Sequence, residues 1–186
     1  VAPLAAVIDR AVPPRVAGEE AGERDSTAGV GRARPGPVDG SPTPLIGYRG
    51  GDRLVEALAG AAGADGVFSL RPAPEDERDL AVEIVARARA AGRSAIVLVP
   101  EAEPIPATAS AIADAFGEEV AWFVGGDRRA RYRTWLDIRS GRYPIVVGTR
   151  PAVFAPLPSL GAIVVNREHH PQHREERAPY YHVRDV

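Results

Sequence analysis

The 186-residue chain contains no cysteine, no methionine and no lysine. Without cysteine, the chain can form neither a disulfide nor a thiolate zinc site. Without methionine it cannot begin at its own start codon, so we expect it to be a piece of a longer protein. Without lysine, all 23 basic residues are arginine. The chain therefore lacks the side chain with which P-loop nucleotide sites hold the β and γ phosphates.

The overall charge and hydropathy exclude further classes of protein. The formal net charge is −2 and the pI is about 6.1, so any surface that binds nucleic acid must be local. A hydrophobic content of 45% is enough to build a core. No apolar run approaches the roughly 20 residues of a membrane helix, and no signal-peptide pattern is visible. We therefore expect a cytoplasmic protein without a membrane partner.

Composition divides the chain into three parts. Residues 1–17 contain a short helical pattern, "PLAAVIDRAV", which Pro13 and Pro14 stop. Residues 18–44 are rich in Gly, Pro, Arg and acids without apolar periodicity, which predicts a disordered linker. The globular part is expected over residues 45–186. Its last segment, "YYHVRDV", has the pattern of a helix start, so we expect truncation at this end.

Helical and strand patterns alternate along the globular part. Amphipathic or capped segments predict helices at about 51–63, 74–92, 104–116 and 128–139. Apolar segments predict strands at 94–99, 120–124, 143–148 and 161–165, and "GVFSL" at 66–70 is a further short apolar run. The alternation predicts a single α/β domain with a doubly wound, mostly parallel sheet. Functional sites of such sheets lie at the carboxyl ends of the strands, here 100–101, 125–126, 148–150 and 166–169.

Several of these segments together resemble one protein family. They are "AIVLVPE" (95–101), "GTRPAVFAP" (148–156), "LGAIVV" (160–165), "REHH" (167–170) and "RAPYYHVRDV" (177–186). The chain resembles the first helicase lobe of the bacterial replication restart, or primosomal protein N′ (PriA), family. Residues 1–17 are similar to the end of the DNA-binding region that precedes this lobe. The resemblance implies a RecA-like (P-loop NTPase-type) fold; active members use ATP and Mg²⁺, and their zinc lies in cysteine-rich segments outside this chain.

The chain departs from the family pattern where a nucleotide should bind. The glycine-rich phosphate loop should fall on "RPAPEDER" (71–78), which has no glycine and has Glu77 in the place of lysine. Asn166 replaces the metal-holding aspartate, and Arg167 replaces the acid that would activate water. Arginine cannot act as a base at neutral pH. We therefore expect no catalytic residue and no cofactor in this chain, and a degenerate nucleotide site at Arg71, Glu77, Arg78, Asn166, Arg167, Glu168 and His169, similar to the actinobacterial branch of the family.

Residues 127–150 hold seven arginines against two aspartates, and arginine suits phosphate binding. Together with the resemblance, this predicts DNA contact by Thr108, Arg128, Arg129, Thr149 and Arg150. The competing interpretation of the arginines is an ordinary solvated helix face. The four histidines lack the spacing of metal ligands, so no metal site is expected. Trp122 and Trp135 fit the apolar periodicity better than a base-stacking role.

The sequence leaves three functions open. The first is a non-catalytic lobe that binds forked or single-stranded DNA and other primosome proteins at stalled replication forks. The second is an active ATP-dependent 3′→5′ DNA helicase in which arginines substitute for lysine. The third is a protein-interaction module without DNA contact. The degenerate nucleotide site favours the first.

Overall fold

The computed structural model describes residues 12–16, 44–124, 127–178 and 180–186. The predicted helix within residues 1–17 and the linker predicted for 18–44 therefore lie almost wholly outside the described residues. So does the predicted strand end at 125–126.

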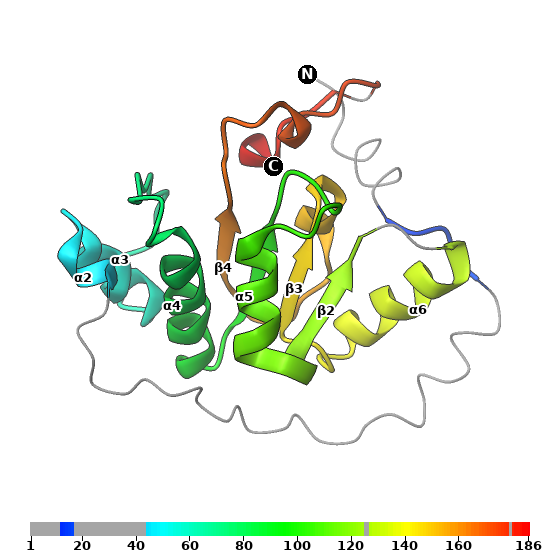
Figure 1. The fold of residues 1–186 in the computed structure, drawn as a ribbon. Coiled ribbons are helices and arrows are strands. Elements are labelled where there is room, and N and C mark those ends of the chain that lie inside the picture. The colour runs from blue at the N-terminus through cyan, green and yellow to red at the C-terminus, as the bar shows by residue number, and fades with distance from the viewer. Residues whose placement is uncertain (1–11, 17–43, 125–126, 179) are drawn as a thin grey trace.

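Four strands form one parallel sheet (Figure 1). They are β1 (Ser94–Leu98), β2 (Val120–Phe123), β3 (Ile145–Gly148) and β4 (Leu160–Val165), in the spatial order β2-β3-β1-β4. All three strand pairings are parallel. Every residue of β1 is buried, as expected for a continuously apolar central strand. The predicted α/β fold is confirmed, and each predicted strand lies within two residues of its observed bounds.

One face of the sheet is covered by α4 (Glu77–Ala90) and α5 (Ala107–Phe116), and α2 (Pro44–Gly47) and α3 (Gly51–Leu58) pack against α4 on this side. The longest of these helices, α4, has acids in its first turn and arginines in its last, the order that the helix dipole favours. Val85, Val97, Ile112 and Val147 from the helices and the sheet are at most 1% exposed and form the centre of this core.

The opposite face is covered by α6 (Arg128–Arg139), so the sheet is doubly wound. Asp127 caps this helix by accepting hydrogen bonds from the backbone N–H groups of Arg129 and Ala130. Ile138 packs there against Ile96 and other residues of the sheet. Short 3₁₀ segments, η3 (Arg150–Phe154), η4 (Pro171–His173) and η5 (Val183–Asp185), lie beyond the carboxyl ends of the strands (Figure 1). A further 3₁₀ turn, η2 (Gly117–Glu119), joins α5 to β2.

Two predicted elements differ in the structure, and one apolar run forms no strand. Helix α3 ends at Leu58, not at residue 63, because Gly60 takes a left-handed φ of 79° and the chain turns there. The apolar run 66–70 forms no strand; Val67 is fully exposed. The final segment forms the 3₁₀ turn η5 where a helix start was predicted.

Among the described residues, no helix combines the length and apolar character needed to cross a membrane.

Candidate functional site

The candidate site lies where the strands end. Because all four strands are parallel, their carboxyl ends share one edge of the sheet, and the helices that follow begin near that edge. Glu77 is the first residue of α4, Thr108 is the second of α5, and Asn166 directly follows β4. The fold thus brings together residues that the sequence analysis assigned to different segments.

Glu77, Asn166 and Arg167 form one hydrogen-bonded cluster. The Asn166 Nδ2 donates to Glu77 Oε1 at 2.6 Å, and the Arg167 Nε donates to the same oxygen at 3.3 Å. Asn166 Nδ2 also lies 3.3 Å from Thr108 Oγ1, which accepts its second hydrogen bond. Asn166 and Thr108 are buried, whereas the Arg167 side chain is 55% exposed. The negative charge of this cluster therefore comes from the helix start, and its positive charge comes from the end of β4.

Arg167 adopts a left-handed backbone conformation, with φ at 51°. Residues other than glycine adopt this region at a conformational cost and keep it where surrounding contacts hold them. The contact of Arg167 with Glu77 is one such restraint. The turn after β4 is thus held by an interaction with a residue 90 positions away in the sequence.

The other predicted members of the degenerate nucleotide site lie apart from this cluster. Arg71, Arg78 and His169 are exposed. Glu168 instead accepts a hydrogen bond from Arg184 at 2.8 Å, close to η5. Of the seven predicted residues, Glu77, Asn166 and Arg167 are therefore the ones that the described interactions join together.

His173 is a buried residue of the site, and the sequence analysis predicted no structural role for it. Its Nε2 donates to the carbonyl oxygen of Asn166 at 2.8 Å, and the side chain is fully buried. With Nε2 protonated, Nδ1 is an acceptor, and it has no hydrogen-bond partner within the described parts of the chain. No spacing in the sequence distinguishes this histidine from the three others.

The environment of His173 favours its neutral form. Desolvation by burial lowers its pKa below the usual value, and the charges of His182 and His170 act in the same direction. The hydrogen bond to Asn166 and the charge of Glu168 oppose the shift. No group of three or more potential ligands among the described residues could hold a metal ion.

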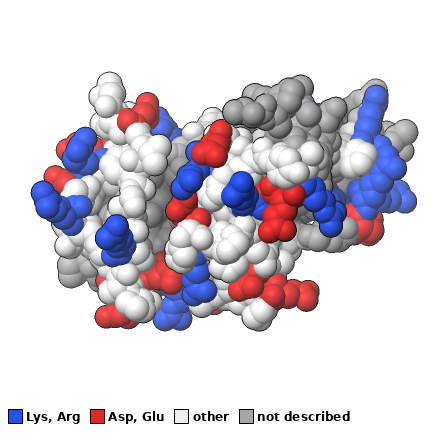
Figure 2. Space-filling view, turned by 90° about the horizontal axis from the view of Figure 1, so that it is seen from above, with Lys and Arg blue, Asp and Glu red and all other residues white. Residues whose placement is uncertain are grey.

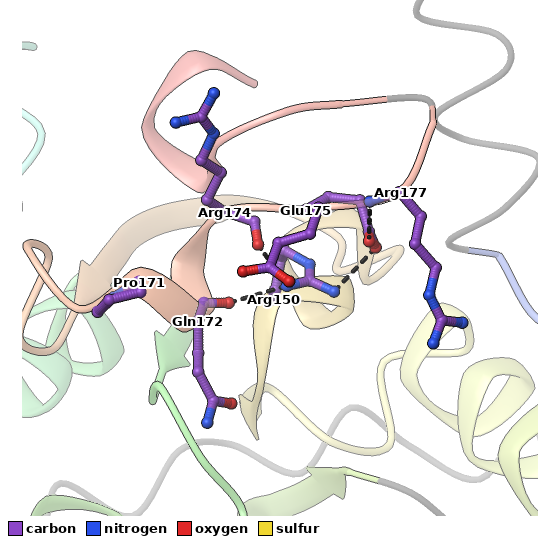
Figure 3. A pocket seen from close by; sticks show the side chains of 7 residues that line it. Arg150, Pro171, Gln172, Arg174, Glu175 and Arg177 are labelled. Atoms are coloured by element: carbon purple, nitrogen blue, oxygen red, sulfur yellow. Dashed lines mark hydrogen bonds and ion pairs between the residues drawn. The ribbon is translucent and has the colours of Figure 1, made fainter.

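Arg150 follows β3 and binds the segment that contains η4 (Figure 3). Its Nη1 donates to the carbonyl oxygens of Gln172 at 2.9 Å and Arg174 at 2.8 Å, and its Nη2 donates to Glu175 Oε2 at 2.8 Å. The guanidinium also lies 6.0 Å from the ring centroid of Tyr181. Both members of the ion pair are largely buried, with 23% and 12% of the side chains exposed. In this structure Arg150 holds the chain's own backbone.

An open depression of about 540 Å³ surrounds Arg150. Figure 3 shows the Arg150 guanidinium directed at its carbonyl and carboxylate partners, whereas the side chains of Arg174 and Arg177 point away from it. The depression is lined by Arg150, Pro171, Gln172, Arg174, Glu175, Glu176 and Arg177. The guanidinium of Arg150 in this depression is therefore already paired with the Glu175 carboxylate.

The remaining predicted DNA-binding residues lie in two different environments. Arg128 and Arg129 are exposed at the start of α6, where Figure 2 shows basic side chains gathered at one end of the molecule. Arg128 Nη2 donates to the carbonyl oxygen of Arg15 at 3.1 Å. Thr149 is half-buried, and Thr108 is buried beside Asn166. DNA contact by these residues stays a prediction, and the exposed arginines are geometrically best placed for it.

The fold and the position of the polar cluster indicate the class of protein. A parallel sheet covered on both faces, with its polar cluster at the carboxyl edge, is a doubly wound α/β architecture and is consistent with a RecA-like lobe. No family model matches the chain.

Similarity to curated proteins then identifies the family. The chain is 38% identical over 154 residues to "Probable replication restart protein PriA" of Mycobacterium leprae, covering 82% of this chain and 23% of that protein. It is 36% identical over 167 residues to the protein of the same name in Mycobacterium tuberculosis H37Rv, covering 88% of this chain and 25% of that protein. "Replication restart protein PriA" of Bacillus subtilis is 33% identical over 109 residues, 58% of this chain and 14% of that protein. The chain belongs to the PriA family and spans about a quarter of the length of its mycobacterial relatives.

Proposed function

We propose that the chain is a DNA-binding lobe of a replication restart protein and that it works without ATPase or helicase activity. The observation that carries the proposal is the contact of Glu77 with Asn166 and Arg167 at 2.6 and 3.3 Å. In an active member of the family, the position of Glu77 would carry the lysine that holds phosphate.

The charges of this cluster are the reverse of those that a magnesium–nucleotide complex needs. The Glu77 carboxylate would repel a triphosphate, and the loop before it, "RPAPED", has no glycine to bring a nest of N–H groups to the phosphates. On the other side, Asn166 is a weaker Mg²⁺ ligand than aspartate, and Arg167 carries a positive charge that opposes metal binding. The internal contacts also occupy the hydrogen-bonding groups that a ligand would use.

DNA contact is proposed for the exposed start of α6. Residues 127–150 carry a local excess of arginine on a chain whose net charge is −2, so this region is a candidate basic surface. Arg128 and Arg129 lie within this region and are exposed. Forked or single-stranded DNA and other primosome proteins are the partners that a restart role requires, and we propose them for this chain on the strength of its relatives' names.

A nucleotide titration tests the absence of ATPase activity. The full-length protein is titrated with Mg-ATP by calorimetry and assayed for phosphate release with and without forked DNA. We expect neither binding in the micromolar range nor phosphate release. Phosphate release that is stimulated by single-stranded DNA and abolished by Arg167→Ala would overturn the proposal and restore the helicase interpretation.

Salt-dependent DNA binding tests the proposed surface. In fluorescence anisotropy with forked DNA, each lost phosphate contact lowers the slope of log K against log salt by about 0.9. We therefore expect the double variant Arg128→Ala/Arg129→Ala to lower the slope by about 2. Arg53→Ala, which removes an exposed arginine from α3, is the matched control and is expected to leave the slope unchanged. An unchanged slope in the double variant would favour a protein-interaction module without DNA contact at this surface.

A further inference from the structure

The contact of Glu77 with the turn after β4 has a role beyond excluding nucleotide. Its carboxylate oxygen accepts hydrogen bonds from Asn166 and Arg167, which belong to a turn with a left-handed, non-glycine residue. A carboxylate offers such donors the same chemistry as a phosphate oxygen, namely a negative charge and acceptor lone pairs. The place of an external anion beside these donors is thus taken by a carboxylate of the chain itself.

Further hydrogen bonds link this turn to the segment that follows. The backbone carbonyl of Asn166 accepts a hydrogen bond from His173, and Arg150 donates hydrogen bonds to the backbone on either side of His173. A chain of short contacts therefore joins the start of α4 to the end of β4 and then to the region beside β3. Loss of its first member is expected to loosen the members that follow.

We propose that Glu77 acts as a built-in counter-anion, which holds the turn at Asn166–Arg167 and the η4 segment in one conformation without any bound nucleotide. This inference rests on the proposed absence of ATPase activity and specifies what has replaced the ligand. It makes a distinctive prediction: when the carboxylate is removed, the exposed donors form a site for an external anion, with inorganic phosphate as the simplest probe.

Hydrogen exchange of the full-length protein tests the proposal. In Glu77→Ala we expect the amides of residues 166–175 to exchange about tenfold faster, the factor that corresponds to the loss of roughly 1.4 kcal/mol from local opening. Inorganic phosphate at millimolar concentration is expected to reverse this change in Glu77→Ala and to leave the unmodified protein unaffected. Glu75→Ala removes an exposed acid two residues earlier and is the control for nonspecific charge effects.

A double-mutant cycle separates the role of the ion pair from general destabilisation. If Glu77 and Arg167 act through each other, the effects of Glu77→Ala and Arg167→Ala on exchange are less than additive. Additive effects, or exchange in Glu77→Ala equal to that in Glu75→Ala, would overturn the proposal. These outcomes are independent of the ATP titration: the unmodified protein could fail to bind ATP while Glu77 holds nothing in place.

Discussion

Replacement of Arg150 by alanine removes a forked contact whose cost can be worked out from the structure. The guanidinium makes two hydrogen bonds to backbone carbonyls and one to Glu175, all between 2.8 and 2.9 Å. The Glu175 side chain is only 12% exposed, and without Arg150 it keeps the hydrogen bond that its Oε1 accepts from the Arg177 N–H at 3.0 Å. The loss of these three hydrogen bonds, at about 1 kcal/mol each, is expected to cost about 3 kcal/mol. For a domain of this size, that corresponds to a fall in melting temperature of about 6–12 °C.

The assay is thermal unfolding followed by circular dichroism, with DNA binding measured on the same preparations. Arg174→Ala is the matched control, because Arg150 contacts the backbone oxygen of Arg174 and not its exposed side chain. We expect this control to melt within about 1–2 °C of the unmodified protein, in line with the small effects of surface substitutions. Arg150→Lys keeps the charge but not the fork, so we expect an intermediate result.

The alternative role of Arg150 makes the opposite prediction. If its guanidinium contacts DNA, as the sequence suggested, Arg150→Ala would weaken binding and lower the salt slope while melting like Arg174→Ala. That combination would refute the reasoning from the internal contacts.

The remaining predictions concern pH and packing. The pKa of His173 is lowered in the folded state, so on acidification the unfolded chain takes up the proton first. The free energy of unfolding is therefore expected to fall as pH drops through about 6.5. In urea titrations at several pH values, His173→Gln should lack the part of this fall that is due to His173. Hydrogen bonds from the backbone N–H groups of Ala130 and Arg129 lower the pKa of Asp127. The stabilisation of the fold by the Asp127 carboxylate is therefore present at neutral pH and is lost as pH falls through the acid range. In acid titrations followed by the helical circular dichroism signal, Asp127→Asn should not show this loss of stability. A Cβ at Gly148 would lie 2.5 Å from the Cβ of Ala152, so Gly148→Ala should destabilise by about 1–3 kcal/mol in chemical denaturation, whereas Gly47→Ala, which meets nothing within 4 Å, should be close to neutral.

Local patterns in the sequence were sufficient to predict the fold class. The apolar run 94–99 is buried on both faces of the sheet, and the acids and arginines at the two ends of α4 match the helix dipole. These features depend on residues close together in the sequence, which is why periodicity and end signals detect them. The run at 66–70 has a similar apolar composition and forms no strand, because strand formation also needs a neighbouring strand with free hydrogen-bonding groups.

The candidate site was predictable in part. Glu77, Asn166 and Arg167 were singled out by resemblance, but their separation by 89 and 90 residues concealed that they contact one another. DNA contact by Arg150 stays a prediction; in the structure its two Nη groups donate to the chain's own segment at 172–175. No local signal indicates the direction in which such a side chain turns.

The sequence alone determined the alternation of helices and strands and the lack of any lysine to hold a phosphate, because both are properties of composition and short-range order. The tertiary structure decided that a carboxylate from the start of α4 meets the end of β4, and that His173 is enclosed beneath that turn. The physical reason is that parallel pairing of β1 with β4 brings segments far apart in the chain to one edge of the sheet. There the Glu77 carboxylate meets the Arg167 guanidinium.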